Sequence, residues 1–223
     1  MRKYVFLPFV LIFLMLAGVA QENKFSTYYH QRRTLFELLP DTKNEIIFLG
    51  NSITDGSEWV ELFADLRVKN RGISGDTTEG VLYRLNEVTR SKPDKVFILI
   101  GINDLSRDVP KETVFQNICT IATQIRESSP KTKVFVQSIL PVNAALEKFP
   151  KHTNKGEQVI WVNKQLKTWC EANRFAFIDL YSRFKNPGDD LLDPKYTNDG
   201  LHLTGEGYIL WTDIVKPLVF SKK

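Results

Sequence analysis

Two polar segments far apart in the chain carry the residue types that nucleophilic acyl transfer needs. Ser52 follows a short apolar run and the pair Gly50-Asn51, and Asp199 precedes His202 by three residues in a segment without periodicity. A serine hydroxyl can attack an acyl carbon when a histidine accepts its proton, and a neighbouring carboxylate fixes the histidine tautomer. Each segment also has a simpler explanation, because Asn and Ser cap helices well and an isolated Asp-x-x-His is often an ordinary polar turn.

Acyl transfer also requires hydrogen-bond donors for the oxyanion that develops at the attacked carbonyl. Gly75 offers a backbone N–H, Asn103 offers a side-chain amide, and Ser52 adds its own N–H. All three lie where predicted strands end. A glycine required by a turn and an asparagine that caps a helix would explain each residue alone. The joint order Ser52, Gly75, Asn103 and Asp199-x-x-His202 favours one catalytic constellation over separate coincidences.

The segments between these residues alternate between strand and helix patterns. Such alternation implies right-handed crossovers and predicts a three-layer α/β/α, flavodoxin-like fold with a five-stranded parallel sheet. Ligands of such sheets bind at the carboxyl edge of the strands, where the serine, glycine and asparagine are expected. Apolar runs predict strands at Glu45–Leu49, Lys95–Ile100, Lys133–Leu140 and Phe175–Leu180, and Val68–Arg71 is expected to be a short second strand. Apolar spacing predicts helices at Phe25–Leu39, Trp59–Ala64, Thr78–Arg90, 111–127, Glu157–Asn173 and from near Thr204.

The N-terminus has the three parts of a secretory signal peptide. Arg2 and Lys3 precede a mostly apolar run, and small residues lead up to Ala20. We therefore expect cleavage after Ala20, an exported mature protein, periplasmic or secreted, and one domain at residues 21–223. The alternative is an uncleaved membrane anchor, but the apolar run is short for a full span and a cleavage site follows it. The mature chain would then have no stable membrane anchor.

Charge and motifs exclude several binding functions. Cleavage lowers the formal charge from +4 to about +2, and basic and acidic residues are interspersed, so the sequence predicts no nucleic-acid partner. Neither a dinucleotide-binding fingerprint nor a phosphate-binding loop is present, and we expect no cofactor and no metal. Cys119 and Cys170 could form one disulfide or remain two buried thiols, since both lie in predicted helices. The oligomeric state is left open.

At these residues the chain resembles the SGNH hydrolases, also called GDSL-type esterases and lipases. The blocks that carry the resemblance are Gly50-Asn51-Ser52, Gly75 in Gly72-Ile73-Ser74-Gly75-Asp76, Gly101-Ile102-Asn103-Asp104 and Asp199-Gly200-Leu201-His202. The resemblance implies that Ser52 is the nucleophile, His202 the general base and acid, and Asp199 its orienting carboxylate. It also implies an oxyanion hole formed by Ser52, Gly75 and Asn103. One position departs from the family pattern, because Asn51 stands where Asp is usual.

The segment from Arg71 to Thr78 is most similar to one branch of that family, which includes the platelet-activating-factor acetylhydrolase subunits and bacterial carbohydrate O-acetylesterases. This resemblance implies an exported serine esterase that hydrolyses acetyl or other small acyl esters, with O-acetyl groups on carbohydrates as the expected substrate. The alternatives are a lysophospholipase- or thioesterase-type lipid esterase on the same site and a non-catalytic glycan-binding module. Five residues in or near predicted loops at the active edge could border the pocket or serve only as surface or packing residues: Trp59, Asn143, His152, Lys195 and Tyr196.

Overall fold

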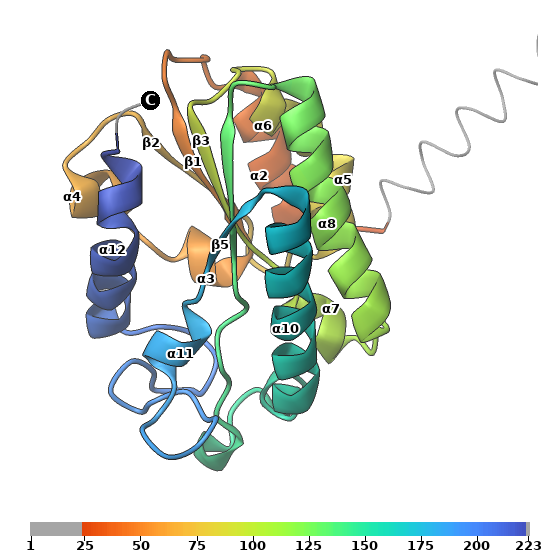
Figure 1. The fold of residues 1–223 in the computed structure, drawn as a ribbon, viewed down its shortest axis with the longest axis vertical. Helices are drawn as coiled ribbons and strands as arrows, with labels where there is room; N and C mark the ends of the chain where they lie inside the picture. The colour runs from red at the N-terminus through yellow and green to blue at the C-terminus, as the bar shows by residue number, and fades with distance from the viewer. Residues whose placement is uncertain (1–23, 222–223) are drawn as a thin grey trace, which may run out of the picture.

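The structure is a computed structural model that describes residues 24–221, and the predicted signal peptide at residues 1–20 lies outside the described residues (Figure 1). The strands are β1 (Ile46–Gly50), β2 (Val68–Gly72), β3 (Lys95–Leu99), β4 (Lys133–Gln137) and β5 (Ala176–Ile178). The longer helices are α2 (Thr27–Leu38), α8 (Lys111–Ser128), α10 (Gly156–Asn173) and α12 (Gly205–Val219). The shorter ones are α3 (Ser52–Asp55), α4 (Trp59–Phe63), α5 (Thr78–Tyr83), α6 (Leu85–Thr89), α7 (Ile102–Ser106), α9 (Pro150–Thr153) and α11 (Tyr181–Phe184), with a 3-10 turn at Ala144–Leu146.

The five strands form one parallel sheet in the order β2-β1-β3-β4-β5, which confirms the predicted fold. In β1, Gly50 pairs with Gly72 of β2 on one side and with Leu99 of β3 on the other. The three strands therefore end at one level, and the loops that follow them start side by side. This arrangement brings the segments with Ser52, Gly75 and Asn103 to one edge of the sheet.

Helices cover both faces of the sheet. In Figure 1, α4 and α12 lie on one face, and α5, α6, α8 and α10 lie on the other. The Phe48, Phe97 and Phe135 rings stack across neighbouring strands, with centroid distances of 4.9 and 4.5 Å. Trp59 stacks on Phe48 at 4.0 Å and meets the edge of Trp211 at 4.8 Å. Trp59 is therefore part of this aromatic core and does not border a substrate pocket.

Several elements differ from the prediction, and the short helices α3, α7 and α11 have no counterpart in it. The helix expected at Thr78–Arg90 is interrupted at Arg84, whose ψ of 12° ends α5 and whose side chain turns into the protein to meet buried acceptors. The strand expected at Lys133–Leu140 ends at Gln137, because the Asn163 side chain bonds the N–H and C=O of Ile139 in place of a neighbouring strand. The polar loop that follows also contains α9, which the spacing of apolar residues did not predict.

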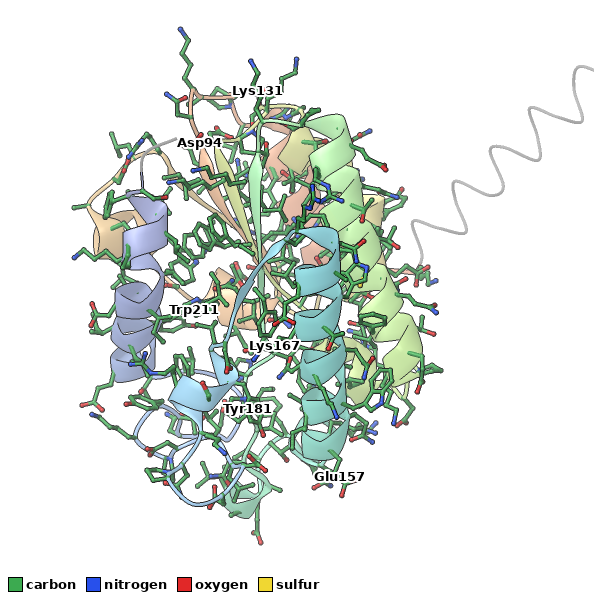
Figure 2. The ribbon with its side chains drawn as sticks, in the orientation of Figure 1. Asp94, Lys131, Glu157, Lys167, Tyr181 and Trp211 are labelled. Atoms are coloured by element: carbon green, nitrogen blue, oxygen red, sulfur yellow. The ribbon has the colours of Figure 1, made fainter. Side chains whose placement is uncertain are left out.

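The two ends of the sheet have different surroundings. Lys131, in the turn before β4, lies at one end of the molecule, and Glu157, at the start of α10, lies at the other (Figure 2). The strands run toward the Glu157 end, where α3, α7 and α11 are located in Figure 1. This carboxyl edge carries all the residues of the site described below.

Candidate active site

Ser52 is the first residue of α3 and follows the end of β1 by two positions. The fully buried Asn51 caps the short helix, because its side-chain oxygen accepts a hydrogen bond of 3.1 Å from the Ile53 N–H. Its amide nitrogen has no hydrogen-bond partner among the described residues. The cap requires only a side-chain oxygen that accepts a hydrogen bond, and Asn51 supplies it as well as the aspartate that is usual in the family would. The geometry of this turn does not depend on a negative charge.

Ser52, His202 and Asp199 form one continuous set of hydrogen bonds. The Ser52 Oγ lies 3.1 Å from His202 Nε2, and His202 Nδ1 lies 2.8 Å from Asp199 Oδ2. A carboxylate accepts hydrogen bonds, so Nδ1 carries the proton and Nε2 presents its lone pair to the serine hydroxyl. The structure thus brings together the three residues that the sequence predicted, although 150 positions separate Ser52 from His202.

The Asp199–His202 segment is a tight turn held by its own backbone. Asp199 Oδ1 accepts hydrogen bonds from the N–H groups of Leu201 at 2.8 Å and His202 at 2.7 Å. Gly200 has a φ of +82°, and a Cβ there would lie 2.2 Å from the Asn143 carbonyl oxygen, so the turn requires glycine. Burial alone raises the pKa of Asp199, but the hydrogen bonds from His202 and Leu201 outweigh it and hold the pKa below its usual value. Asp199 therefore faces the histidine as a carboxylate.

Three donors lie around the serine at the ends of neighbouring strands. Ser52 follows β1, Gly75 follows β2 and Asn103 is in α7 after β3. Gly75 has a φ of +79°, a conformation that glycine adopts without strain. Within the described part of the chain, the N–H groups of Ser52 and Gly75 donate no hydrogen bond. Both N–H groups are therefore available to an acceptor on a substrate.

The Asn103 side chain is held in one orientation by two contacts. Its Nδ2 donates to the Asp76 carbonyl at 2.8 Å, and its Oδ1 lies 3.0 Å from His152 Nε2. Because Oδ1 can only accept, His152 donates its Nε2–H, and one amide hydrogen of Asn103 is left for another acceptor. Burial lowers the pKa of His152, and the nearby His202 and Arg107 lower it further. The sequence suggested His152 only as a residue that could border the pocket, and its contact with Asn103 has no sequence signal.

Two polar contacts connect the glycine loop to its neighbours. Asp55, at the end of α3, accepts hydrogen bonds from the N–H of Ser74 at 3.1 Å and from its hydroxyl at 2.7 Å. Arg107 Nη2 donates to the Gly75 carbonyl oxygen at 2.8 Å. The loop that carries the Gly75 N–H is therefore fastened to the nucleophile helix on one side and to the end of α7 on the other.

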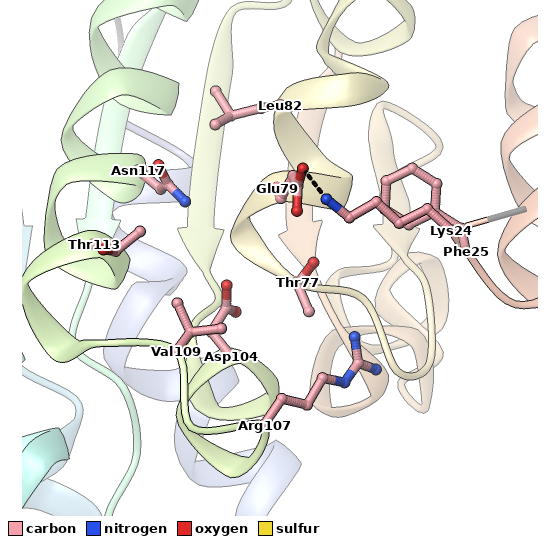
Figure 3. A pocket seen from close by; sticks show the side chains of 10 residues that line it. All are labelled: Lys24, Phe25, Thr77, Glu79, Leu82, Asp104, Arg107, Val109, Thr113 and Asn117. Carbon is pink, nitrogen blue, oxygen red and sulfur yellow. Dashed lines mark hydrogen bonds and ion pairs between the residues drawn. The ribbon is translucent and has the colours of Figure 1, made fainter. Parts of the chain in front are cut away.

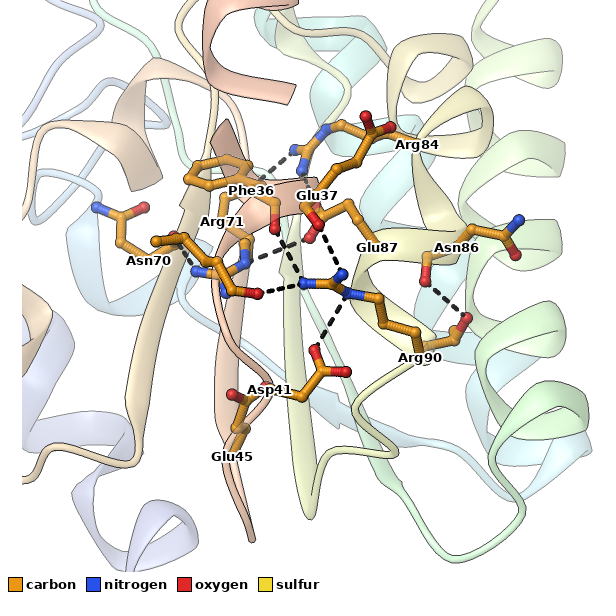
Figure 4. A network of polar contacts seen from close by, with 12 residues as sticks. Phe36, Glu37, Asp41, Glu45, Asn70, Arg71, Arg84, Asn86, Glu87 and Arg90 are labelled. Carbon is orange, nitrogen blue, oxygen red and sulfur yellow. Dashed lines mark hydrogen bonds and ion pairs between the residues drawn. The ribbon is translucent and has the colours of Figure 1, made fainter. Parts of the chain in front are cut away.

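A network of polar contacts includes Arg71, Arg84 and Glu87 (Figure 4), and it reaches this loop through Asp76, which follows Gly75 and pairs with Arg84. Arg84 has no exposed side-chain surface, and it forms ion pairs with Asp76 at 2.9 Å and Glu87 at 2.8 Å. It also donates to the carbonyl oxygens of Arg71 at 2.8 Å and Gly50 at 3.3 Å. Burial raises the pKa of Asp76 to about 6 and also raises the pKa of Glu87, although Arg84 opposes both shifts. Arg84 thus joins the ends of β1 and β2, from which the serine and glycine loops start.

The remaining residues suggested as pocket borders have other contacts. Asn143 is buried and bonds the Leu192 carbonyl and the Ala145 N–H, so its role is structural. The Lys195 ammonium lies over the Tyr196 ring at 5.4 Å. The sequence did not point to Phe149, whose ring meets the His202 ring edge-on at 5.1 Å. Phe149 has a φ of +48° and keeps 45% of its surface exposed beside the catalytic candidates.

The cysteines lie outside this site. Cys119 on α8 and Cys170 on α10 are free thiols, and burial raises the pKa of each to about 12. Across residues 24–221, no group of three or more His, Cys, Asp or Glu side chains is arranged to hold a metal ion. None of the helices in that range is long and apolar enough to cross a membrane.

Comparison with known proteins relates this geometry to a family. Residues 48–210 match the model of the GDSL-like Lipase/Acylhydrolase family. Platelet-activating factor acetylhydrolase IB subunit alpha1 of Bos taurus is 33% identical over 176 residues, which cover 75% of this chain and 72% of that protein.

Two solved structures have a similar fold. A GDSL-like lipase from Bacteroides thetaiotaomicron aligns with a TM-score of 0.74 and 28% identity, covering 86% of this chain and 96% of that one. A catalytic mutant of an acetylxylan esterase from Geobacillus stearothermophilus aligns with a TM-score of 0.65 and 19% identity. That alignment covers 82% of this chain and 97% of the esterase. The sheet and its flanking helices are therefore common to all three proteins.

Proposed function

The chain belongs to the GDSL-like lipase/acylhydrolase family and is an ester-hydrolysing enzyme, and we propose that Ser52, His202 and Asp199 are its catalytic residues. The observation that carries this proposal is the unbroken hydrogen-bond path from Ser52 Oγ through the His202 ring to Asp199 Oδ2. The path gives the serine a proton acceptor and gives that acceptor an ionised partner.

The proposed reaction has two steps. Ser52 Oγ attacks the ester carbonyl carbon while its proton moves to His202 Nε2, and Asp199 stabilises the resulting imidazolium. The tetrahedral intermediate then releases the alcohol, which takes the proton from His202 and leaves an acyl group on Ser52. A water molecule repeats the sequence on the acyl-enzyme, giving the carboxylic acid and free Ser52.

The oxyanion of each tetrahedral intermediate would bind to the N–H groups of Ser52 and Gly75 and to the Asn103 amide. The two N–H groups donate to no other acceptor in the described part of the chain, and Asn103 keeps one amide hydrogen free because Asp76 and His152 fix the rest of its side chain. Donors that are fixed before the reaction need no reorganisation when charge develops, which makes them effective in catalysis.

Replacement of the serine tests the proposal. Ser52→Ala should reduce hydrolysis of p-nitrophenyl acetate to the uncatalysed background and abolish labelling by a fluorophosphonate probe, with an unchanged melting temperature. Ser182→Ala removes a hydroxyl from an exposed serine and serves as the matched control. Full residual activity in Ser52→Ala would refute the assignment, and absence of labelling in the unaltered protein would favour a non-catalytic module.

The proposed substrate is an O-acetylated carbohydrate. The small acyl group is supported by the bovine relative, which is named an acetylhydrolase. The carbohydrate part is supported by the resemblance of the Arg71–Thr78 segment to O-acetylesterases and by the signal-peptide pattern. A panel of acetylated sugars beside acyl esters of increasing chain length tests both parts. Preference for acetylated sugars would support the proposal, and rates that rise with acyl length would contradict it.

A lipid ester is the second candidate, because the bovine relative is named for platelet-activating factor. The same panel distinguishes the two, since a lipid esterase should prefer an acetylated or acylated glycerolipid to every sugar tested.

We also propose that the protein is exported after cleavage behind Ala20. Expression of the full chain followed by mass measurement of the exported product should give a polypeptide that begins at Gln21. Retention of residues 1–20 would contradict the proposal.

A further inference from the structure

A cleft with a volume of about 690 Å³ lies between the end of α7 and the region of α9 and α10. This volume falls within the usual range of small-molecule sites, which is roughly 300 to 1,000 Å³. Figure 2 shows Glu157, close in sequence to the cleft residues, at the carboxyl end of the sheet. The walls of the cleft include Arg107, Asp108, Lys151, His152, Asn154 and Lys155.

The cleft shares two residues with the proposed oxyanion site. His152 lines the cleft and also contacts Asn103 Oδ1 at 3.0 Å. Arg107 lines the cleft and donates to the Gly75 carbonyl at 2.8 Å. An ester whose carbonyl oxygen is bound by Gly75 and Asn103 therefore has the cleft next to the bond that is broken. The cleft is within reach of the alcohol part of such a substrate.

The side chains that line the cleft give it a positive charge. Three cationic side chains line it, and Asp108 is the only carboxylate among the described residues of its walls. Asp108 pairs with Lys155 at 2.7 Å, whereas Arg107 and Lys151 form no ion pair with any described residue. Burial lowers the pKa of His152, and the neighbouring His202 and Arg107 lower it further. The neutral imidazole is therefore favoured, and His152 adds no positive charge to the cleft near neutral pH.

The Asp104 carboxylate interacts electrostatically with Arg107 but forms no ion pair with it. Asp104 is buried and uses both side-chain oxygens to accept hydrogen bonds from Thr78. In Figure 3 the Arg107 guanidinium extends away from Asp104 toward the loop that contains Thr77, and no ion pair joins the two side chains. Arg107, Lys151 and Lys155 thus outnumber Asp108 and give the cleft a net positive charge, whereas the expected mature chain is close to neutral.

We propose that this cleft binds an anionic group, a carboxylate or a phosphate, carried by the alcohol part of the ester. The inference rests on the proposed function and narrows its substrate class to acetyl esters of acidic compounds. A guanidinium presents paired N–H donors that match the oxygens of a carboxylate or phosphate, and a lysine adds a mobile point charge. Positive charge in a cleft also concentrates anionic ligands near the site. The group could belong to an acidic sugar or to a glycerophospholipid.

Pairs of substrates that differ only in charge test the proposal. The first pair is O-acetylated oligogalacturonate and its neutral methyl ester, and the second is a 2-acetyl glycerophosphate lipid and the matching neutral 2-acetyl glycerolipid. In one pair the anionic member should have a kcat/KM about three- to tenfold higher, mainly through a lower KM. The pair that shows this preference identifies the source of the anion.

Lys151→Gln should bring the ratio of the two kcat/KM values toward one, and added salt should have the same effect. Lys131→Gln, at the opposite end of the molecule, is the matched control and should leave the ratio unchanged. Equal kcat/KM values within both pairs, or a preference that persists in Lys151→Gln, would overturn the anion subsite alone. If the unaltered protein hydrolyses p-nitrophenyl acetate but no member of either pair, the anion subsite fails alone. If it hydrolyses none of these esters, the proposed function fails and the subsite fails with it.

Discussion

The two sides of Ser52 are built in different ways. On the acid–base side, Asp199 and His202 are three residues apart, and Asp199 is positioned by the N–H groups of its own turn. On the oxyanion side, Asn103 is oriented by the Asp76 carbonyl and by His152, which are 27 and 49 positions away. One side is therefore specified locally, and the other depends on contacts between distant segments.

The two sides also differ in their solvation. The side chains of His202 and Asp199 keep 32% and 20% of their surface exposed, whereas those of Arg84 and Asp76 are fully buried. The pKa of Asp199 is held low, so its contribution to stability is present above its unfolded pKa and is lost as the pH falls through the folded pKa. The pKa of Asp76 is raised to about 6, so its contribution is present at acidic pH and is lost as the pH rises through that value. The acid–base side, where His202 exchanges protons, is therefore accessible to water. The network behind the oxyanion side is shielded from water.

Among the substitutions that compare the two sides, Asp199→Asn should have the largest catalytic effect, and it tests the local side. An amide nitrogen facing His202 Nδ1 would donate to it, which moves the imidazole proton to Nε2 and removes the acceptor for Ser52. We expect kcat for p-nitrophenyl acetate to fall by about three to four decades. Asp213→Asn changes an exposed acid on α12 and is the control. A loss below tenfold would show that His202 does not depend on Asp199.

Arg84→Met should have the largest effect on stability and tests the buried side. Removing Arg84 leaves Asp76 buried without its cation and leaves Glu87 with only Arg71, whose Nε lies 3.3 Å from Glu87 Oε2. This loss should cost about 3 to 5 kcal/mol in the free energy of unfolding in urea at pH 8. The deficit should shrink at pH 5, since both carboxyl groups have raised pKa values and protonation removes the unpaired charge. Arg183→Met alters an exposed arginine for comparison. A deficit that does not vary with pH would contradict this account of the network.

Asn103→Ala should lower kcat by about two to three decades with little change in KM, as expected for one donor that binds the oxyanion and not the ground state. Asn86→Ala removes the amide of an exposed asparagine and serves as the control. An effect confined to KM would assign Asn103 to substrate binding and would weaken the contrast between the two sides.

His152 should give the smallest effect, since it acts through Asn103. His152→Leu removes the donor to Asn103 Oδ1 and should lower kcat by up to about tenfold, the value of one hydrogen bond. His152→Gln places an amide N–H near the same point and should restore most of the rate. Steady-state kinetics with p-nitrophenyl acetate separate the cases. Equal losses in the two variants, or a change in KM alone, would refute a positioning role.

The alternation of strands and helices and the candidate residues Ser52, Asp199 and His202 could be predicted without any structure. Buried strands of a parallel sheet require continuous apolar runs, so their places are visible in the sequence. The Asp199–His202 contact is equally visible, because a turn of three residues brings the two side chains together whatever the rest of the chain does.

The way in which the oxyanion side is held could not be predicted from the sequence and depends on the folded chain. The break at Arg84, the contact between His152 and Asn103, the approach of Phe149 to His202 and the cationic cleft all join segments that are distant in the chain. No local pattern encodes such contacts, since they depend on the order of the strands and on where each loop turns. Burial then selects which polar groups remain paired, because an unpaired group costs free energy only once water is excluded.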